Sequence, residues 1–338
     1  MMSKIRWGIL GAGAVVDRWI KGAMQLDNME IAAISSRSRE TAEKQAGKWN
    51  IKRILAYEEM IRSDDIDIVY IAVPHTAHRE LAVMAMNAGK HVLVEKPAAV
   101  NAAEFQEMAD CAKRNQVFLM EAVWTRFFPI IKRALDYIQN GKIGDVRLVE
   151  AKFSFRVGDG DHSRLTDLNR AGGGLLDTGV YNLHLAHMIY NKAPERLTGF
   201  ASIDTDDCHI QVDEQASYIG QYDRGELAVL TSGIRTETLH TAFIYGTKGY
   251  MEIPVFWKPT CMKVTIDGYT EYIEEKVPQR IEGIEDEGYQ YEIAYVNECL
   301  RKGWKESPEV NLKSSLCVLK QMDELRKNWG LVYPGEEI

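Results

Sequence analysis

Cysteine is scarce and scattered in this chain of 338 residues. The sequence has five cysteines, an odd number, and no two of them form a C-x-x-C pair. Neither a disulfide framework nor a zinc site is indicated. The spacing of His162, His184 and His187 forms no metal motif either, so we expect no catalytic metal. A reducing cytoplasm is the simplest setting for such a chain.

Long apolar runs and an excess of basic charge are also missing. No window approaches the roughly 20 apolar residues that a membrane-spanning helix needs, and the first residues lack the apolar core of a signal peptide. The chain has 41 Lys and Arg against 49 Asp and Glu, a formal net charge of −8. Surfaces that bind nucleic acid usually carry excess basic charge. We therefore expect neither a nucleic-acid nor a membrane partner.

Alternating strands and helices fill the first third of the chain. Short apolar runs predict strands over 5–10, 31–34, 68–73, 91–94 and 117–120. Between them, helical patterns cover 15–26, 40–49, 77–88 and 102–115. This alternation predicts an α/β fold, a doubly wound parallel sheet of the Rossmann type with helices on both faces. We place this dinucleotide-binding domain over residues 1–122.

The remaining residues, 123–338, show a different pattern. Strands are predicted over 146–155, 215–222, 227–232, 242–245 and 262–266. Helices are predicted over 128–139, 180–190, 289–301 and 314–328, the first as the link between domains. We expect a second α+β domain, for substrate binding and oligomerisation, with a large and mostly antiparallel open sheet. Its last helices could pack back on the first domain.

A glycine-rich turn stands between the first predicted strand and the first predicted helix. Gly11 would permit a tight turn, and Gly13 would let the backbone approach a pyrophosphate at the helix N-terminus. The predicted diphosphate site consists of Gly11, Ala12, Gly13, Ala14 and Val15. Val16 stands where the third glycine of G-x-G-x-x-G usually is, so an ordinary strand–helix turn is the alternative.

The end of the second predicted strand bears on which dinucleotide is bound. An NAD enzyme usually has Asp or Glu about 20 residues after the glycine turn. Here Ser36, Arg37 and Ser38 stand at this point, and the first acid is Glu40. Hydroxyl groups and a guanidinium can bind a 2′-phosphate that a carboxylate would repel. We favour NADP over NAD, although Ser36 or Ser38 could also cap a helix.

Three further segments resemble a known family. They are Glu95-Lys96-Pro97, the run from Met120 to Pro129 (MEAVWTRFFP), and the run from Gly172 to Tyr181 (GGGLLDTGVY). With the glycine turn they resemble the Gfo/Idh/MocA oxidoreductases, and within that family the branch of dimeric dihydrodiol dehydrogenases and NADP-dependent D-xylose dehydrogenases. The resemblance covers nearly the whole chain. It implies a Rossmann domain followed by an open-sheet domain through which homodimers or homotetramers form.

The resemblance also assigns candidate catalytic residues. The family's catalytic lysine matches Lys96, and the acid of its glycine motif matches Asp177. Tyr181 replaces the histidine of that motif, as in the dihydrodiol dehydrogenase branch, where a tyrosine takes the acid/base role. We predict Lys96 and Tyr181 as the acid/base pair and Asp177 as the residue that positions the substrate. From spacing alone, an exposed lysine, a helix N-terminal aspartate and a surface tyrosine remain alternatives.

The family positions around the coenzyme can be carried over in the same way. The matching residues are Pro74, His75 and His78 after the third strand, Glu95 and Lys96 after the fourth, and Ala122, Trp124 and Arg126 after the fifth. His78 could equally pack under the next helix, and Trp124 could belong to the core. Residues that could line the substrate pocket are Phe155, Arg156, His162 and Arg164.

The sequence thus predicts an NADP-dependent oxidoreductase that acts on a sugar, a cyclic polyol or a vicinal diol. One alternative is a glycosidase that uses tightly held NAD, as one branch of the superfamily does. That branch usually keeps histidine at the position of Tyr181. The other alternative is a dinucleotide-sensing regulator without catalysis.

Overall fold

The computed structural model describes residues 4–158, 164–203 and 210–336. The chain forms two compact units. The first contains residues 1–99, 103–127 and 277–313, and the second contains 100–102, 128–276 and 314–338. Residues 277–313, which follow the second sheet in the sequence, thus cluster with the first unit.

Five parallel strands form the sheet of the first unit, in the order β2-β1-β3-β4-β5. They are β1 (Ile5–Leu10), β2 (Met29–Ser35), β3 (Ile68–Ile71), β4 (His91–Glu95) and β5 (Leu119–Ala122). Every residue of β3 and β5 is buried, as expected of strands covered on both faces. The predicted Rossmann architecture is confirmed.

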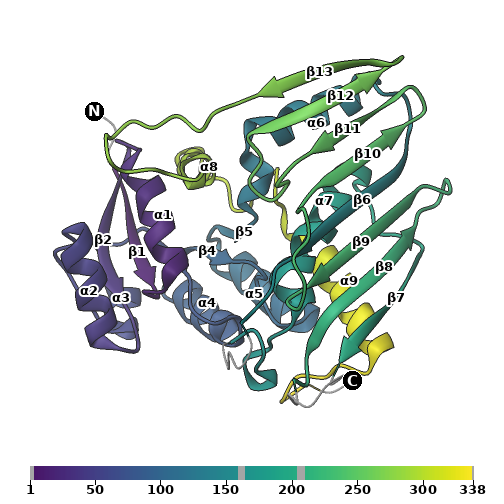
Figure 1. Cartoon of the computed structure of the whole chain (residues 1–338). Coiled ribbons are helices and arrows are strands. Elements are labelled where there is room, and N and C mark those ends of the chain that lie inside the picture. The colour runs from purple at the N-terminus through teal and green to yellow at the C-terminus, as the bar shows by residue number, and fades with distance from the viewer. Residues whose placement is uncertain (1–3, 159–163, 204–209, 337–338) are drawn as a thin grey trace. The chain divides into compact units, whose positions relative to one another are not determined.

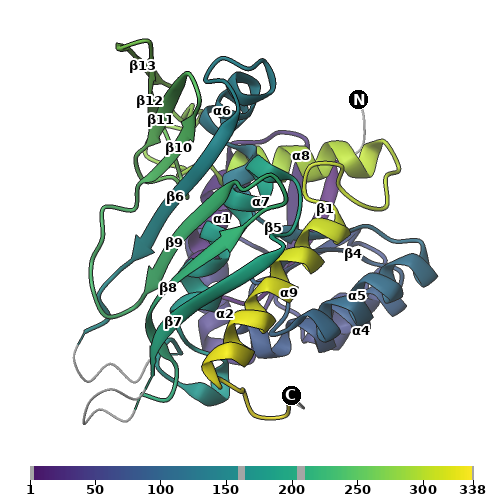
Figure 2. The same ribbon diagram turned by 90° about the vertical axis from the view of Figure 1, so that its right-hand side faces the viewer.

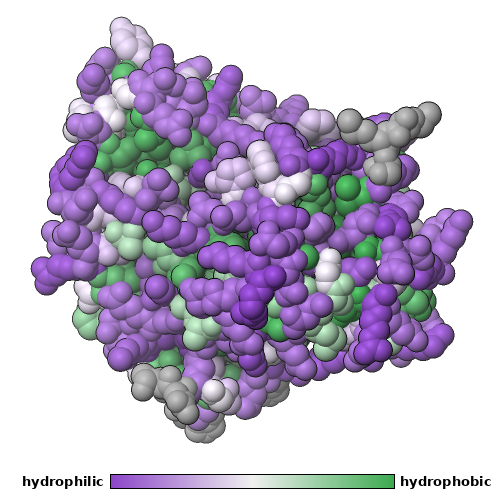
Figure 3. Space-filling view, turned by 180° about the vertical axis from the view of Figure 1, so that it is seen from behind, coloured by the Kyte–Doolittle hydropathy of each residue, from purple (hydrophilic) through white to green (hydrophobic). Residues whose placement is uncertain are grey.

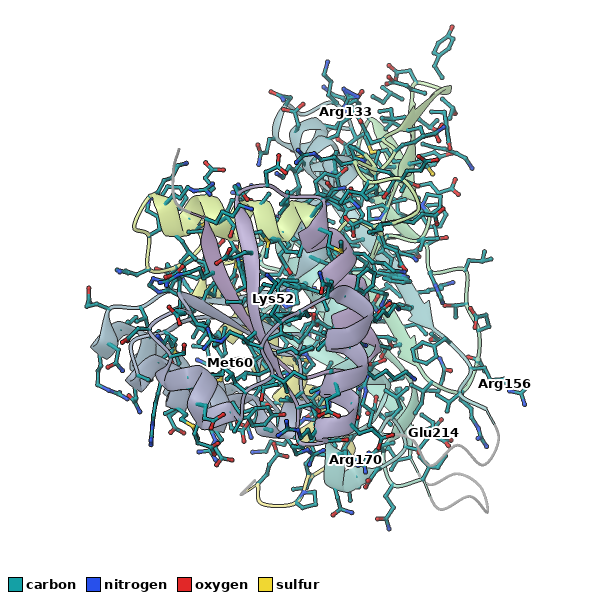
Figure 4. The ribbon with its side chains drawn as sticks, turned by 90° about the vertical axis from the view of Figure 1, so that its left-hand side faces the viewer. Lys52, Met60, Arg133, Arg156, Arg170 and Glu214 are labelled. Carbon is teal, nitrogen blue, oxygen red and sulfur yellow. The ribbon has the colours of Figure 1, made fainter. Side chains whose placement is uncertain are left out.

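Helices connect these strands. They are α1 (Ala14–Met24), α2 (Arg39–Trp49), α3 (Tyr57–Arg62), α4 (His78–Asn87) and α5 (Ala102–Asn115), together with the short 3₁₀ helices η1 (His75–Ala77) and η2 (Trp124–Phe127). Because crossovers between parallel strands are right-handed, the strand order places α1 on one face of the sheet and α4 and α5 on the other (Figure 1). Helix α3 was not predicted; its Met60 packs against Gly8 of β1 (Figure 4).

Helix α8 (Tyr289–Arg301) completes the first unit from far along the chain. It packs beside α1, where a Cβ on Gly22 would lie 2.6 Å from the Cβ of Tyr289. The indole nitrogen of Trp7 donates to Asn297 Oδ1 of α8 at 3.0 Å, and both residues are fully buried. A segment close to the C-terminus therefore belongs to the core of the N-terminal sheet.

The second unit contains an eight-stranded sheet in the order β13-β12-β11-β10-β6-β9-β8-β7. Neighbouring strands are antiparallel except β6 and β9, which are parallel. The strands are β6 (Val146–Ser154), β7 (Arg196–Ile203), β8 (Asp213–Gln221), β9 (Leu227–Gly233), β10 (Ala242–Gly246), β11 (Gly249–Ile253), β12 (Cys261–Ile266) and β13 (Tyr269–Glu274). The predicted large and mostly antiparallel sheet is confirmed.

Three helices belong to the second unit: α6 (Pro129–Gln139), α7 (Val180–Tyr190) and α9 (Leu312–Trp329). Helix α7 packs on β6 and β9, and the indole of Trp329 in α9 donates to the carbonyl of Gly199 in β7 at 3.1 Å (Figure 2). The other face of the sheet carries the exposed positions of alternating strands, such as Ser217, Ile219 and Gln221 of β8.

The surface seen in Figure 3 is covered mainly by hydrophilic side chains, with apolar ones in separate patches. This agrees with a chain in which 27% of the residues are charged. No helix in the described ranges is long and apolar enough to cross a membrane.

Candidate active site

The turn between β1 and α1 lies at the carboxyl edge of the parallel sheet. Gly11 has a φ of +125°, and a Cβ there would lie 2.3 Å from the carbonyl oxygen of Ala72. Its amide donates to the carbonyl of Ser35 at 2.8 Å, so the turn is tied to the ends of both neighbouring strands. Packing within the protein therefore requires glycine at this position.

Gly13 differs from Gly11 in what surrounds it. It is exposed and begins α1 as the N-cap, and no described side chain caps that helix. A Cβ on Gly13 would meet no described protein atom within 4 Å. The protein itself thus does not need glycine here, whereas a diphosphate seated on the helix N-terminus would. The predicted residues Ala12, Ala14 and Val15 lie in the same turn, with amides that fit an anion.

The end of β2 carries no acid. Ser36 is half-buried, and Arg37 and Ser38 are exposed. The Ser38 hydroxyl accepts the amide of Thr41 at 3.3 Å, so Ser38 is the N-cap of α2. Within the described residues, Arg37 has no carboxylate partner, whereas Arg39 pairs with Glu43 at 2.9 Å. Arg37 is thus available to an anionic ligand at the edge of the sheet.

His78 links the loops that follow β3 and β4. It is buried at the start of α4, with Nδ1 3.0 Å from the carbonyl oxygen of Pro97 and Nε2 2.9 Å from that of Val73. Burial lowers the pKa of His78 to about 4, so the ring is neutral at physiological pH. His75 is also buried, with its ring edge-on to His78 at 6.3 Å. The ring of His78 therefore braces the backbone, and Pro74 lies in the loop that it braces.

Lys96 follows β4 directly, beside a partly buried carboxylate. Glu95 accepts the Tyr70 hydroxyl at 2.6 Å and the Lys96 amide at 3.2 Å. Burial raises the pKa of Glu95, against the effect of these hydrogen bonds and of the Lys96 charge. The Lys96–Pro97 peptide bond is cis. Lys96 thus lies at the same edge of the sheet as the glycine turn.

The residues at the end of β5 and just after it are mostly buried. Ala122 and Trp124 are 2% and 3% exposed, and the Trp124 ring stacks on that of Tyr289 at 4.2 Å. Arg126 pairs with Glu309 at 3.1 Å. Trp124 therefore packs against α8 within the first unit, and Arg126 has an acidic partner there.

A buried acid on α8 was not identified as a site residue from the sequence. Glu292 is fully buried, and neither of its carboxyl oxygens has a hydrogen-bond partner among the described residues. Burial, and then the charges of Glu95 and Glu121, raise the pKa of Glu292 well above its usual value. The signal in the sequence is that Glu292 lies within the helical stripe of Tyr289, Ile293 and Val296 that α8 buries.

Asp177 and Tyr181 lie in the second unit, just before the start of α7 and in its first turn. Residues Leu175–Gly179 form a single π-helical turn, η4, and α7 follows without a break. Asp177 is 8% exposed and accepts the guanidinium of Arg164 at 2.9 Å. Because the π turn is wider than an α turn, the spacing of these two residues is not that of an ordinary α-helix. Of the other predicted lining residues, Phe155 and Arg156 follow β6, and His162 lies outside the described residues.

Glycines allow this turn to lie close to β9 and β8. A Cβ on Gly174 would lie 2.7 Å from the Cα of Gly233, and one on Gly179 would lie 2.7 Å from the hydroxyl of Tyr218. Arg170 ends the short helix before the turn, and Glu214 stands on the strand beside it (Figure 4). The turn is buried at every position, so its course is set by close packing rather than by solvent-exposed loop contacts.

An aromatic cluster surrounds Tyr181. The ring of Phe153 in β6 lies 5.5 Å from that of Tyr181 and stacks on that of Trp257 at 5.0 Å. His240 lies 4.7 Å from the Phe153 ring, and its Nε2 is 2.8 Å from the carbonyl oxygen of Ser154. These residues come from four distant segments, so the sequence offered no signal for the cluster. The cluster forms an aromatic wall beside the ring of Tyr181.

Comparison with known proteins assigns the family. The model "Oxidoreductase family, NAD-binding Rossmann fold" matches residues 5–123, and the model "GFO/IDH/MocA C-terminal domain" matches residues 131–252. The trans-1,2-dihydrobenzene-1,2-diol dehydrogenase of Mus musculus is 35% identical over 339 residues, covering 98% of this chain and 99% of the relative. The human enzyme of the same name is 32% identical, with the same coverage.

Solved structures of other oxidoreductases have the same fold over almost the whole chain. An aldose-aldose oxidoreductase from Caulobacter crescentus complexed with glycerol has a TM-score of 0.85 and 25% identity, and covers 96% of this chain and 97% of its own. A 3-ketoreductase from Actinomadura kijaniata, in complex with TDP-benzene and NADP, has a TM-score of 0.83 at 21% identity and covers 97% of this chain and 98% of its own, which shows the shared fold. The predicted resemblance is thus confirmed, and the chain belongs to the Gfo/Idh/MocA oxidoreductase family as an NAD(P)-dependent oxidoreductase.

Proposed function

We propose that this enzyme interconverts an alcohol and a carbonyl group on a sugar, a cyclic polyol or a vicinal diol, with NADP as its coenzyme. The observation that carries this proposal is that Asp177 lies on a buried, glycine-packed turn and that Tyr181 follows it in the first turn of α7, beside aromatic rings. The similarity to trans-1,2-dihydrobenzene-1,2-diol dehydrogenases over almost the whole chain supports it. The scattered cysteines support a reducing, cytoplasmic setting.

The coenzyme would be held by residues of the first unit. Amides of the glycine turn and the N-terminus of α1 would bind the diphosphate, and Ser36, Arg37 and Ser38 would bind the 2′-phosphate. The other proposed coenzyme contacts are Pro74, His75, His78, Glu95, Lys96, Ala122, Trp124 and Arg126. Of these, His78 would act indirectly, because its ring holds the backbone at Val73 and Pro97. The bound nicotinamide supplies the hydride acceptor or donor of the reaction.

The chain's own residues handle the proton. In the oxidation, the hydroxyl proton of the substrate passes to the Tyr181 oxygen, and in the reduction the Tyr181 hydroxyl returns a proton to the carbonyl oxygen. The Lys96 ammonium donates a hydrogen bond to the same reacting oxygen, and its positive charge favours the phenolate form of Tyr181. Asp177, already paired with Arg164, accepts a neighbouring substrate hydroxyl and so orients the substrate. The aromatic rings of Phe153 and Trp257 would pack against the apolar face of the substrate.

Turnover with a substrate panel tests this proposal. The panel contains aldoses, inositols, dihydrodiols and dicarbonyls, each assayed with NADP(H) and with NAD(H) by the absorbance of the reduced nicotinamide. We expect turnover of at least one class and a tighter affinity for NADP⁺ than for NAD⁺. Arg37→Ala should weaken NADP⁺ binding by about 10- to 100-fold, the value of a charge-assisted contact, with NAD⁺ binding unchanged. Tighter binding of NAD⁺ by the wild type would refute the coenzyme assignment, and no turnover of any member would refute the substrate class.

We further propose that the open face of the eight-stranded sheet joins copies of this chain into a homodimer or homotetramer. Large apolar side chains stand exposed on three neighbouring strands of that face: Phe200 (88%) on β7, Ile219 (45%) on β8 and Leu227 (38%) on β9. The strand register places these side chains on the same face as Ser217, Thr231 and Glu150. Large apolar side chains exposed together on one sheet face are typical of an interface, and a symmetric pair covers them on both copies.

Light scattering measures this association. We expect the wild type to show two or four times the chain mass of 38.4 kDa. A Phe200→Glu/Ile219→Lys variant should return to the mass of one chain, because it buries two charges in the interface. Met24→Lys, at an exposed position on α1 of the other unit, is the matched control and should not dissociate. A wild type that remains a single chain at high concentration contradicts the proposal.

A further inference from the structure

Two buried side chains hydrogen-bond to the backbone in the first half of the turn of residues 172–179. Asp213, the first residue of β8, is fully buried, and its Oδ2 accepts the amide of Leu175 at 2.6 Å. Tyr333 follows α9 and is 2% exposed, and its hydroxyl donates to the carbonyl of Gly172 at 2.6 Å. Both side chains bind backbone groups, so they determine the course of the turn itself.

The fit between Asp213 and the turn is close. Gly173 has a φ of +113°, and a Cβ there would lie 2.0 Å from Asp213 Oδ1. Burial raises the pKa of Asp213 to about 7, against the effect of the hydrogen bonds from the backbone of Leu175 and Gly174 and the charge of Arg326. A buried carboxyl is costly unless it is hydrogen-bonded. The hydrogen bond to the amide of Leu175 thus explains why an acidic residue is buried at position 213.

Tyr333 is itself held by a buried polar cluster. The guanidinium carbon of Arg326 lies 4.7 Å from the centroid of the Tyr333 ring. Arg326 is 4% exposed and pairs with Glu336 at 2.6 Å and with Asp323 at 2.8 Å. Glu336 in turn accepts the amide of Tyr333 at 3.0 Å. The segment after α9 is therefore a fixed support that presents one hydroxyl to the turn.

We propose that Asp213 and Tyr333 are positioning residues, which hold the 172–179 turn so that Asp177 and Tyr181 meet the substrate in one arrangement. The inference rests on the proposed function of Asp177 and Tyr181. The anchored amide of Leu175 is only two residues before Asp177, within one buried π-helical turn. A change in the course of this turn therefore moves Asp177 and the first turn of α7 together. Displacements of about 1 Å at reacting groups can lower a rate by about 100-fold.

Two variants remove the two anchors. Tyr333→Phe deletes one hydroxyl, and Asp213→Leu replaces the acceptor by an apolar side chain of similar size. Tyr190→Phe is the matched control, because the Tyr190 hydroxyl also donates to one backbone carbonyl, that of Leu227, at 2.8 Å, and lies in the same unit away from the turn. Asp213→Asn keeps an oxygen acceptor and serves as the conservative replacement.

The measurements separate positioning from folding. In Tyr333→Phe and Asp213→Leu we expect kcat per coenzyme-binding site to fall roughly 10- to 100-fold, with the Kd of NADP⁺ within twofold of wild type. Hydrogen exchange of the peptide that contains residues 172–179 should become faster in both. Asp213→Asn should recover most of the lost kcat, and Tyr190→Phe should match the wild type. If Asp213→Leu does not fold, Tyr333→Phe alone decides the matter.

Other outcomes overturn the inference. It is wrong if kcat per binding site in Tyr333→Phe stays within twofold of the wild type, or if exchange of the turn is unchanged. If those results occur while Asp177→Asn and Tyr181→Phe lose activity, the proposed function stands and only the positioning role fails. If Asp177→Asn and Tyr181→Phe are as active as the wild type, both proposals fail.

Discussion

Replacing Tyr181 by phenylalanine is expected to lower kcat by about 10²- to 10⁴-fold, the usual contribution of a general acid or base. The variant removes only the hydroxyl and keeps the ring that lies 5.5 Å from Phe153 and 6.2 Å from Trp257. Its melting temperature and its affinity for NADP⁺ should therefore remain close to those of the wild type. Steady-state kinetics, coenzyme fluorescence titration and thermal denaturation measure the three quantities.

Variants of Lys96 test the other member of the proposed acid/base pair. Lys96→Met should cost a similar factor, because it removes the charge that favours the phenolate. Lys96→Arg keeps the charge but cannot give up its proton or match the geometry of an ammonium, so only a small part of the activity should return. In the double variant the losses should not multiply, because the two residues act as a unit.

Tyr190→Phe is the control for both series. It lies on the same helix as Tyr181 and loses one hydroxyl that donates to Leu227. We expect it to retain wild-type kcat and to lose about 1 kcal/mol of unfolding free energy, the net value of a hydrogen bond. Wild-type kcat in both Tyr181→Phe and Lys96→Met would instead favour a protein that keeps the fold without this chemistry.

The apolar pattern was sufficient for several elements of both units. Strand 5–10 and helices 102–115, 180–190 and 289–301 were predicted with the bounds that the structure has. Each of these elements is rich in buried residues, and the apolar pattern ends where the element ends. β5 begins two residues later than predicted, at Leu119, because Val117 and Phe118 are buried but precede the paired part of the strand.

Strands β7, β11 and β13 were not predicted, and for β7 and β13 there is a physical reason. β7 contains a glycine and exposes Phe200, and β13 has only Ile273 buried, so neither has the apolar face from which strands were recognised. Both are edge strands of the second sheet. An edge strand that pairs on one side alone needs less apolar surface than a central strand does.

Site residues could be predicted from the sequence only where they belong to a short motif. The glycine turn, Lys96 and the run from Asp177 to Tyr181 each stand within a motif, so single segments were enough. Asp213 contacts the 172–179 turn and Trp257 lies near Tyr181, both from distant parts of the chain, and no local pattern marks them. Family resemblance carried over the motif residues, whereas the residues that support them depend on how β6, β8 and β9 are paired.

Gly11→Ala is expected to lower the stability of the fold, whereas Gly13→Ala is expected to weaken coenzyme binding. The two glycines are only two residues apart. At Gly11 a side chain must adopt a φ of +125° and approach the Ala72 carbonyl oxygen to 2.3 Å. The backbone strain alone costs about 1–3 kcal/mol, so Gly11→Ala should lower the unfolding free energy by at least that amount. Chemical denaturation measures this loss directly.

Gly13→Ala should instead leave the fold nearly intact. Its φ of −78° suits any residue, and the new methyl group meets no described protein atom within 4 Å. The loss of stability should stay below about 1 kcal/mol, the usual effect at a helix N-cap. In the proposed coenzyme site the methyl group would stand between the backbone and the pyrophosphate, so the Kd of NADP⁺ should rise by about 100-fold, close to 3 kcal/mol.

Gly47→Ala is the matched control for this pair. Gly47 lies inside α2, its φ is not positive, and a Cβ there meets no described atom within 4 Å. Alanine at a helix interior should add about 0.5–1 kcal/mol of stability and leave the Kd of NADP⁺ unchanged. If Gly13→Ala binds NADP⁺ as tightly as Gly47→Ala does, the coenzyme does not lie against this turn. In that case the diphosphate assignment would have to be given up even though the Rossmann fold remains.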